Sequence, residues 1–142
     1  MRVHHSAVVV ADIEASTRFY REGLGMTVIM DTSFDGDWPA LFNARSNRLR
    51  SVFLGDAEDS RSGIVELVAF DGGADQRPVA DAPAAGLFLL SFNVDVAATL
   101  ENLRRIGVSP VGRTSMPGPK GPVAMVTLRD PDGVLIELID LP

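Results

Sequence analysis

The sequence predicts an α+β fold of two repeated βαβββ modules, which form a curved sheet with an open cleft. Two observations support this prediction. A pattern of apolar strand, Asp, amphipathic helix and Gly occurs at residues 4–26 and again at 87–110. After each copy comes a closing strand with the same central Glu-Leu pair, which starts at Glu66 and at Glu137, 71 residues apart. That offset is too long for a solenoid repeat and fits a fused pair of half-domains.

Length, charge and cysteine content narrow the class of protein. A chain of 142 residues has the size of one domain, and 46% hydrophobic and 23% charged residues are ordinary for a globular protein. The net charge of −6 disfavours nucleic acid or an anionic membrane as the partner. The chain has no cysteine, no apolar run of the roughly 20 residues that span a bilayer, and an N-terminus unlike a signal peptide. We therefore expect a cytoplasmic protein with one domain at 1–142, divided into modules at 1–70 and 87–142 by a linker at 71–86.

The first module begins with a strand at residues 2–10. Alternation places His5 on one face of this strand and His4 on the other, where we predict no functional role for His4. Asp12 is the predicted N-cap of a helix over about residues 13–24. Further strands are expected at 26–31, 49–55 and 63–70, and an irregular loop over one end of the sheet at 34–47.

The second module repeats this order. A strand at 87–94 leads to Asp95, which is the predicted cap of a helix that ends at Gly107. A short strand at 108–113 and a mobile loop at 114–122 follow. The last two strands, 122–130 and 134–140, are joined by an Asp-Pro-Asp-Gly turn. The two resulting sheets are expected to face each other across the cleft.

Three side chains able to bind a metal occupy matching positions in the two modules. Counting back five residues from the end of each opening strand gives His5 and Leu89, while Glu66 and Glu137 are equivalent in the closing strands. Both glutamates lie among aliphatic residues, where an uncompensated carboxylate costs several kcal/mol. Compensation can come from a divalent metal, from a proton shared between the carboxylates, or from a protonated His5.

These residues resemble the vicinal oxygen chelate superfamily, which includes glyoxalase I, methylmalonyl-CoA epimerase, extradiol dioxygenases, and fosfomycin and bleomycin resistance proteins. The matching segments are His5 and the following VVVADIEASTRFYREGLGM, the VELV strand, the Val-Asp before the second helix, and the C-terminal RDPDGVLIELI. The resemblance covers nearly the whole chain and implies a glyoxalase-like fold. In glyoxalase-like members, residues matching His5, Glu66 and Glu137 hold a divalent metal, together with a His that is Leu89 here. The missing His weighs against extradiol cleavage, whose iron uses that ligand.

The expected cofactor is therefore a divalent ion (Zn, Ni, Co, Mn or Fe) at His5, Glu66 and Glu137, and the two glutamates are also the candidate catalytic residues. Parity gives a mostly apolar cleft with a few polar points, which suits a small, largely hydrophobic substrate that carries oxygens. The candidate cleft residues are Ala7, Val9, Val68, Leu89, Ser91 and Asn93.

Three other groups are candidates for roles at the cleft. Arg45, Arg48 and Arg50 would hold an anionic part of the substrate or simply face solvent. Trp38 and Phe42 would form a lid or anchor their own loop. The loop at 114–122 could close over the cleft mouth.

Three functions follow, and the sequence leaves them open. The leading hypothesis is a metal-assisted isomerase, epimerase or lyase, in which one carboxylate moves a proton. The first alternative is a metal-free protein of the bleomycin-resistance type that binds a small molecule or drug. The second is a metal-free enzyme that uses Glu66 or Glu137 as a base with a raised pKa.

We also expect a homodimer, since relatives of this length often pair. A linker of about 16 residues spans up to roughly 50 Å when extended, so the second half can pack on its own first half or on a partner. In the exchanged form, His5 and Glu66 come from one chain and Glu137 from the other.

Overall fold

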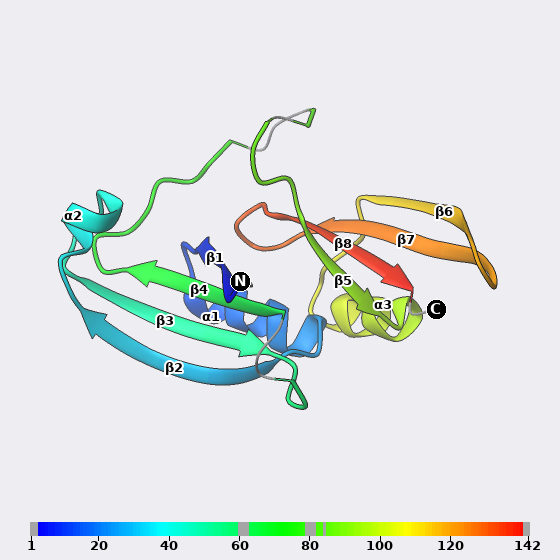
Figure 1. The fold of residues 1–142 in the computed structure, drawn as a ribbon, viewed down its shortest axis with the longest axis horizontal. Helices are drawn as coiled ribbons and strands as arrows, with labels where there is room; N and C mark the ends of the chain where they lie inside the picture. Colours follow the sequence, from blue (N-terminus) through cyan, green and yellow to red (C-terminus); the bar gives the residue numbers. More distant parts are fainter. Residues whose placement is uncertain (1–2, 60–62, 79–81, 84, 141–142) are drawn as a thin grey trace.

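The computed structural model describes residues 3–59, 63–78, 82–83 and 85–140, which form two four-stranded sheets. Figure 1 shows the sheets side by side, with strands β1 (His5–Val9) and β5 (Leu90–Val94) at their neighbouring edges. The strand orders are β1-β4-β3-β2 and β5-β8-β7-β6, so the two halves have the same topology. In each sheet the first and last strands of the module pair in parallel and the remaining pairs are antiparallel. The predicted α+β fold of two βαβββ modules is confirmed.

The remaining elements have the following bounds. In the first module they are α1 (Ile13–Arg18), the π-helical turn η1 (Phe19–Gly23), β2 (Thr27–Asp35), α2 (Trp38–Phe42), β3 (Arg48–Gly55) and β4 (Ile64–Phe70). In the second they are α3 (Val96–Arg105), β6 (Gly112–Gly118), β7 (Gly121–Arg129) and β8 (Leu135–Asp140). None of the helices in the described part of the chain is long and apolar enough to cross a membrane.

Both predicted helix caps are present. The Asp12 carboxylate accepts the backbone N–H groups of Glu14 and Ala15 at 3.0 Å, and that of Asp95 accepts from Ala98 at 2.9 Å. Each bond satisfies a donor that the first helical turn leaves unpaired. Gly107 follows α3 with φ +81°, a left-handed conformation that favours glycine and ends the helix as expected.

The core lies between the helices and one face of each sheet. Val8, Leu67, Ile136 and Leu138 point to this side and are almost fully buried, as is Leu103 of α3. The opposite face of each sheet carries the side chains of the alternate residues. We call these two surfaces the open faces.

The modules contact each other through η1 and the turn after β7. A Cβ on Gly23 would lie only 2.7 Å from Leu103 Cδ2, so the glycine permits the close approach of η1 and α3. The buried Tyr20 hydroxyl donates to Asp130 Oδ2 at 2.8 Å. Asp132 accepts from the Ala11 N–H at 2.8 Å. Because these contacts join the modules on the helix side, the two sheets lie side by side within one chain, and the expectation that they face each other is wrong.

Residues 34–47 contain more order than predicted. Part of this segment is the end of β2, and Trp38–Phe42 form the short helix α2. The Asp37 carboxylate accepts from the Ala40 N–H at 3.2 Å, and Pro39 lies in the first turn, where a missing N–H has no cost. A local cap therefore overrides the irregular composition that suggested a loop.

The expected loop at 114–122 is instead a β-hairpin. Strand β6 continues to Gly118, which pairs with Gly121, and Pro119 and Lys120 form the turn. Pro117 is tolerated because β6 is the edge strand of its sheet. The proline and glycine content of this segment suggested a loop, but pairing of β6 with β7 makes it a hairpin.

Candidate functional site

The site begins on the open face of the first sheet. The parallel register pairs His5 with Ile64, Ala7 with Glu66, and Val9 with Val68. Residues paired in this way point to the same face, because successive side chains of a strand alternate. His5 and Glu66 therefore share one face with the predicted cleft residues Ala7, Val9 and Val68, as the parity of the sequence indicated.

His5, Glu66 and Ser51 are in direct contact on this face. His5 Nε2 lies 3.0 Å from Glu66 Oε2, with side chains 35% and 15% exposed. The hydroxyl of Ser51, a fully buried residue of β3, donates to Glu66 Oε1 through a short hydrogen bond. Both oxygens of this half-buried carboxylate are thus engaged. Sequence reasoning missed Ser51, because only the alignment of β3 against β4 identifies it.

The open face of the second sheet carries the matching carboxylate. Ser91 pairs with Glu137 in the parallel register, and its hydroxyl donates to Glu137 Oε2 at 2.7 Å. Asn93 lies two residues along the same face and is exposed. Leu89 lies just before β5, two residues ahead of Ser91, as His5 lies two residues ahead of Ala7. This supports the position of Leu89 as the counterpart of His5.

The donors partly fit a divalent ion. An imidazole nitrogen and a carboxylate oxygen suit Zn, Ni, Co, Mn or Fe, and their 3.0 Å separation is one that a metal with bonds of about 2.0–2.2 Å can bridge. The described residues of one chain contain no cluster of three or more His, Cys, Asp or Glu side chains that could hold a metal. Within one chain, the structure therefore joins His5 to Glu66 and does not bring Glu137 to them.

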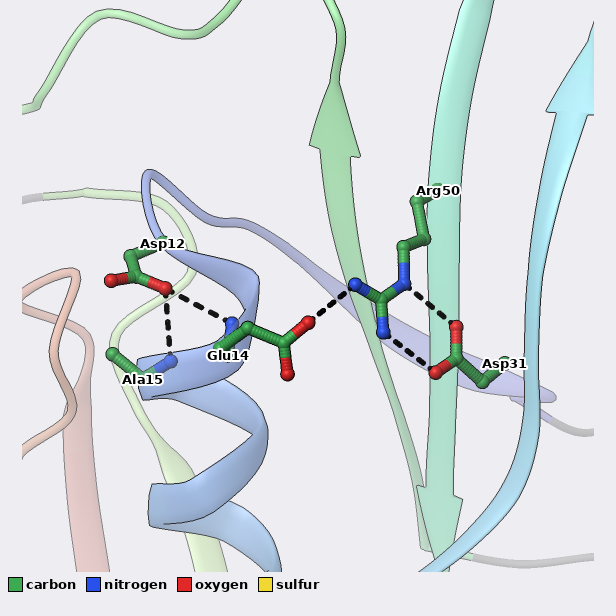
Figure 2. Close-up of polar contacts among 5 residues, drawn as sticks. All are labelled: Asp12, Glu14, Ala15, Asp31 and Arg50. Atoms are coloured by element: carbon green, nitrogen blue, oxygen red, sulfur yellow. Dashed lines mark hydrogen bonds and ion pairs between the residues drawn. The ribbon is translucent and has the colours of Figure 1, made fainter.

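The three arginines considered for anion binding are already paired with acidic side chains. Arg45 contacts Asp75 at 2.7 Å, and Arg48 contacts Asp35 at 3.0 Å. Arg50 binds Asp31 through two nitrogens and Glu14 through a third (Figure 2). Asp31 and Glu14 hold the guanidinium through hydrogen bonds that raise the pKa of Arg50, and the hydrogen bond from Arg50 lowers the pKa of Asp31. Since Glu14 belongs to α1, the Arg50 side chain lies on the helix side of the sheet.

Trp38 and Phe42 anchor α2 to the sheet. Their rings stack with centroids 5.8 Å apart, and the Phe42 ring meets Phe70 edge-on at 6.4 Å. Phe70 lies on β4, four residues from Glu66 and thus on the same open face. Phe42 remains 58% exposed, so this aromatic group borders the open face rather than closing it.

One cavity lies where the two modules meet, and a second lies between the linker and the second module. The smaller, of about 220 Å³, is lined by Ser6 to Val9 of β1, by residues 74–77, and by Leu87, Leu90 and Asp132 among others. The larger, of about 570 Å³, includes Leu89 and Leu135. Neither of these two cavities includes His5, Glu66 or Glu137 in its lining.

A sequence model described as the Glyoxalase/Bleomycin resistance protein/Dioxygenase superfamily matches residues 2–138. With the repeated βαβββ topology, this match establishes that the chain belongs to that superfamily. A lactoylglutathione lyase-like protein, terB, from Aspergillus terreus is 34% identical over 99% of this chain and 75% of its own length. The lactoylglutathione lyase of Escherichia coli O157:H7 is 28% identical over 99% of this chain and 93% of its own length.

Solved structures agree on the fold. A glyoxalase family protein from Bacillus cereus covers 99% of this chain and 93% of its own chain, with a TM-score of 0.80 at 20% identity. The trypanothione-dependent glyoxalase I of Leishmania major covers 99% of this chain and 86% of its own, with a TM-score of 0.65 at 24% identity. These likenesses establish a glyoxalase-like fold.

Proposed function

We propose that this protein is a divalent-metal-assisted isomerase, epimerase or lyase that acts on a small, largely hydrophobic substrate bearing oxygens. Its metal ligands are His5, Glu66 and Glu137. The contact of His5 with Glu66 at 3.0 Å is the observation that carries the proposal, because a nitrogen and a carboxylate donor are already in place on an open face. Membership of the superfamily and the lyase names of its relatives support the reaction class.

The complete site requires two copies of the chain in this proposal. The open face of the first sheet in one copy packs toward the open face of the second sheet in the other, and Glu137 then joins His5 and Glu66. Exposed apolar side chains on these faces favour such pairing: Val9 is 47%, Phe34 39% and Met116 52% exposed. A two-fold dimer makes this contact twice and so contains two sites.

Each carboxylate has its own role in the proposed reaction. A bound divalent ion would polarise a carbonyl oxygen of the substrate and so acidify the neighbouring C–H bond. Glu66, fixed by Ser51 and His5, holds its position throughout. Glu137, on a half-buried site beside Ser91, accepts the proton from the substrate carbon and returns it to the product. Apolar neighbours such as Val68 and Ile139 keep water away.

The contacts of the three arginines considered for anion binding do not support their role in holding an anionic part of the substrate. Arg45, Arg48 and Arg50 are held by Asp75, Asp35 and Asp31, so none of the three offers a free cation to a ligand. Ser91 and Asn93 provide neutral polar groups on the open face of the second sheet.

A metal-free protein that binds a small molecule is the second candidate. Leu89 favours it, because an aliphatic side chain occupies the place equivalent to His5.

A metal-free enzyme is the third candidate. In such an enzyme, Glu137 would act as the base alone, with Ser91 orienting it.

Metal content separates these functions. Purified protein stripped with a chelator and incubated with Zn²⁺, Ni²⁺, Co²⁺, Mn²⁺ or Fe²⁺ should retain about one ion per chain, as three nitrogen and oxygen donors predict. Glu66→Gln removes one charged donor and should lower the retained fraction strongly. The matched control is Glu101→Gln, on the exposed surface of α3. No stoichiometric uptake of any of the five ions would favour the metal-free functions.

A further inference from the structure

His4 lies outside the strand that carries His5. Strand β1 begins at His5, so the alternation of side chains does not extend back to His4. The His4 ring instead turns toward the His5 ring, and their Nδ1 atoms are 2.8 Å apart. The rings meet edge to face, with centroids 5.1 Å apart and planes at 85°. We predicted no role for His4 from the sequence, because a strand that begins at residue 2 would place His4 and His5 on opposite faces.

The His5 imidazole is held at three points. Its Nδ1 faces His4, its ring edge meets Phe53 with centroids 5.4 Å apart, and its Nε2 faces Glu66 at 3.0 Å. Phe53 and Glu66 fix where the ring lies. His4 makes the polar contact to the Nδ1 atom of His5.

We propose that His4 is a positioning residue for His5, an inference that rests on the proposed metal role of His5. A histidine that binds a metal through one ring nitrogen almost always donates the N–H of the other nitrogen to a neighbour, which fixes the tautomer and the orientation. Carboxylates and backbone carbonyls are the common neighbours. In this chain, the Nδ1 of the preceding histidine takes that place.

The short contact between the two Nδ1 atoms requires that one donates and the other accepts. If the Nε2–H of a neutral His5 donates to Glu66, then His5 Nδ1 accepts and His4 donates from its Nδ1–H. If His5 held a divalent ion through Nε2, its ring proton would have to be on Nδ1 and would be donated to His4 Nδ1, and His4 would then carry its own proton on Nε2. The pair holds two ring protons in both states, so metal binding exchanges the tautomers of both rings.

The first test is zinc affinity, measured by competition with a chromophoric chelator at about pH 8. His4→Ala should weaken Zn²⁺ binding by about tenfold, the lower end of the range for loss of a residue that supports a metal ligand. His4→Asn should recover much of this loss, because the Asn amide places a hydrogen-bonding atom where Nδ1 stands. Val3→Ala, at a neighbouring side chain that is 80% exposed, is the matched control and should bind as the parent does.

The second test needs no variant. In ¹⁵N spectra of the histidine rings of the parent protein, Zn²⁺ should convert His5 from the Nε2–H to the Nδ1–H tautomer, and His4 in the opposite direction. Unchanged tautomers in zinc-loaded protein would overturn the inference.

The outcomes separate this inference from the proposed function. If the parent protein takes up no zinc, both fail. If the parent binds zinc and His4→Ala binds equally well, only the role of His4 fails. Equal weakening by His4→Ala and His4→Asn also overturns it, because the hydrogen bond would not be what His4 provides.

Discussion

At the scale of single residues, serine hydroxyls hold both candidate carboxylates. Ser51 donates to Glu66 from the neighbouring strand β3, and Ser91 donates to Glu137 from β5. The two serines do not occupy equivalent positions of the repeat, because Ser91 corresponds to Ala7 by register. The halves have therefore reached the same support for a carboxylate by different residues.

Replacement of Ser51 by Ala should destabilise the protein. It leaves Glu66 Oε1 half-buried without its donor, at a cost of about 1–3 kcal/mol in the free energy of unfolding. Urea denaturation measures this, with Ser33→Ala, at an exposed residue of β2, as control. A loss no larger than that of the control would mean that water replaces the Ser51 hydroxyl.

Replacement of Leu89 by His should strengthen metal binding. The variant supplies a fourth side-chain donor at the counterpart of His5, and we expect an affinity gain of at least about tenfold, or about 1.4 kcal/mol. Zinc competition measures the gain, and Leu87→His, at a side chain that is 81% exposed, is the matched control. Equal affinities in parent and Leu89→His would mean that residue 89 lies away from the metal.

At the scale of elements, the Asp130–Gly133 turn holds the first helix in place. Asp130 accepts the Tyr20 hydroxyl and the N–H groups of Asp132 and Val134, and Asp132 accepts from Ser16. Burial raises the pKa of Asp130, while the hydrogen bond from Tyr20 lowers it. The buried pair thus links the two modules at the cost of desolvating one carboxylate.

Tyr20→Phe should destabilise the fold and raise the pKa of Asp130 further. Loss of a hydrogen bond to a charged group costs about 1.5–3 kcal/mol. Because the pKa of Asp130 is raised in the folded state, proton binding by this carboxyl stabilises the fold. This stabilisation is complete below the ordinary Asp value of about 3.9 and is lost as pH rises through the raised pKa. The Tyr20 hydroxyl stabilises the ionised form of Asp130, so the stability difference between parent and variant should shrink as pH falls through that window.

Urea titrations between pH 3.5 and 7, with a double-mutant cycle that adds Asp130→Asn, provide the measurement. A difference between parent and Tyr20→Phe that does not depend on pH would show that the hydroxyl does not act on the Asp130 carboxylate.

At the scale of the whole molecule, η1 packs against α3 and the two sheets lie side by side (Figure 1). Within one chain, neither open face is covered by the other sheet. The proposed dimer covers each open face with that of a second copy. The proposed site shared between two chains depends on this dimer.

Mixing two defective chains tests the shared site. His5→Ala and Glu137→Ala should each bind little zinc alone. In a mixed dimer one site keeps both residues and the other loses both, so random mixing should restore about one quarter of the parent sites. Mass spectrometry of the intact dimers controls for subunit exchange. No recovery in a sample that contains mixed dimers would place each site within a single chain.

The sequence alone determined what depends on local pattern and on the repeat. Asp12 and Asp95 were predicted as caps because a cap needs only the next few backbone N–H groups, and the repeat equated Glu66 with Glu137 and His5 with Leu89. Tertiary structure decided the contacts of Ser51 and His4, since these depend on how β3 aligns with β4 and on where β1 begins. It also decided that Glu137 does not meet His5 within one chain, because packing of η1 against α3 sets the orientation of the modules, and no local pattern encodes that angle.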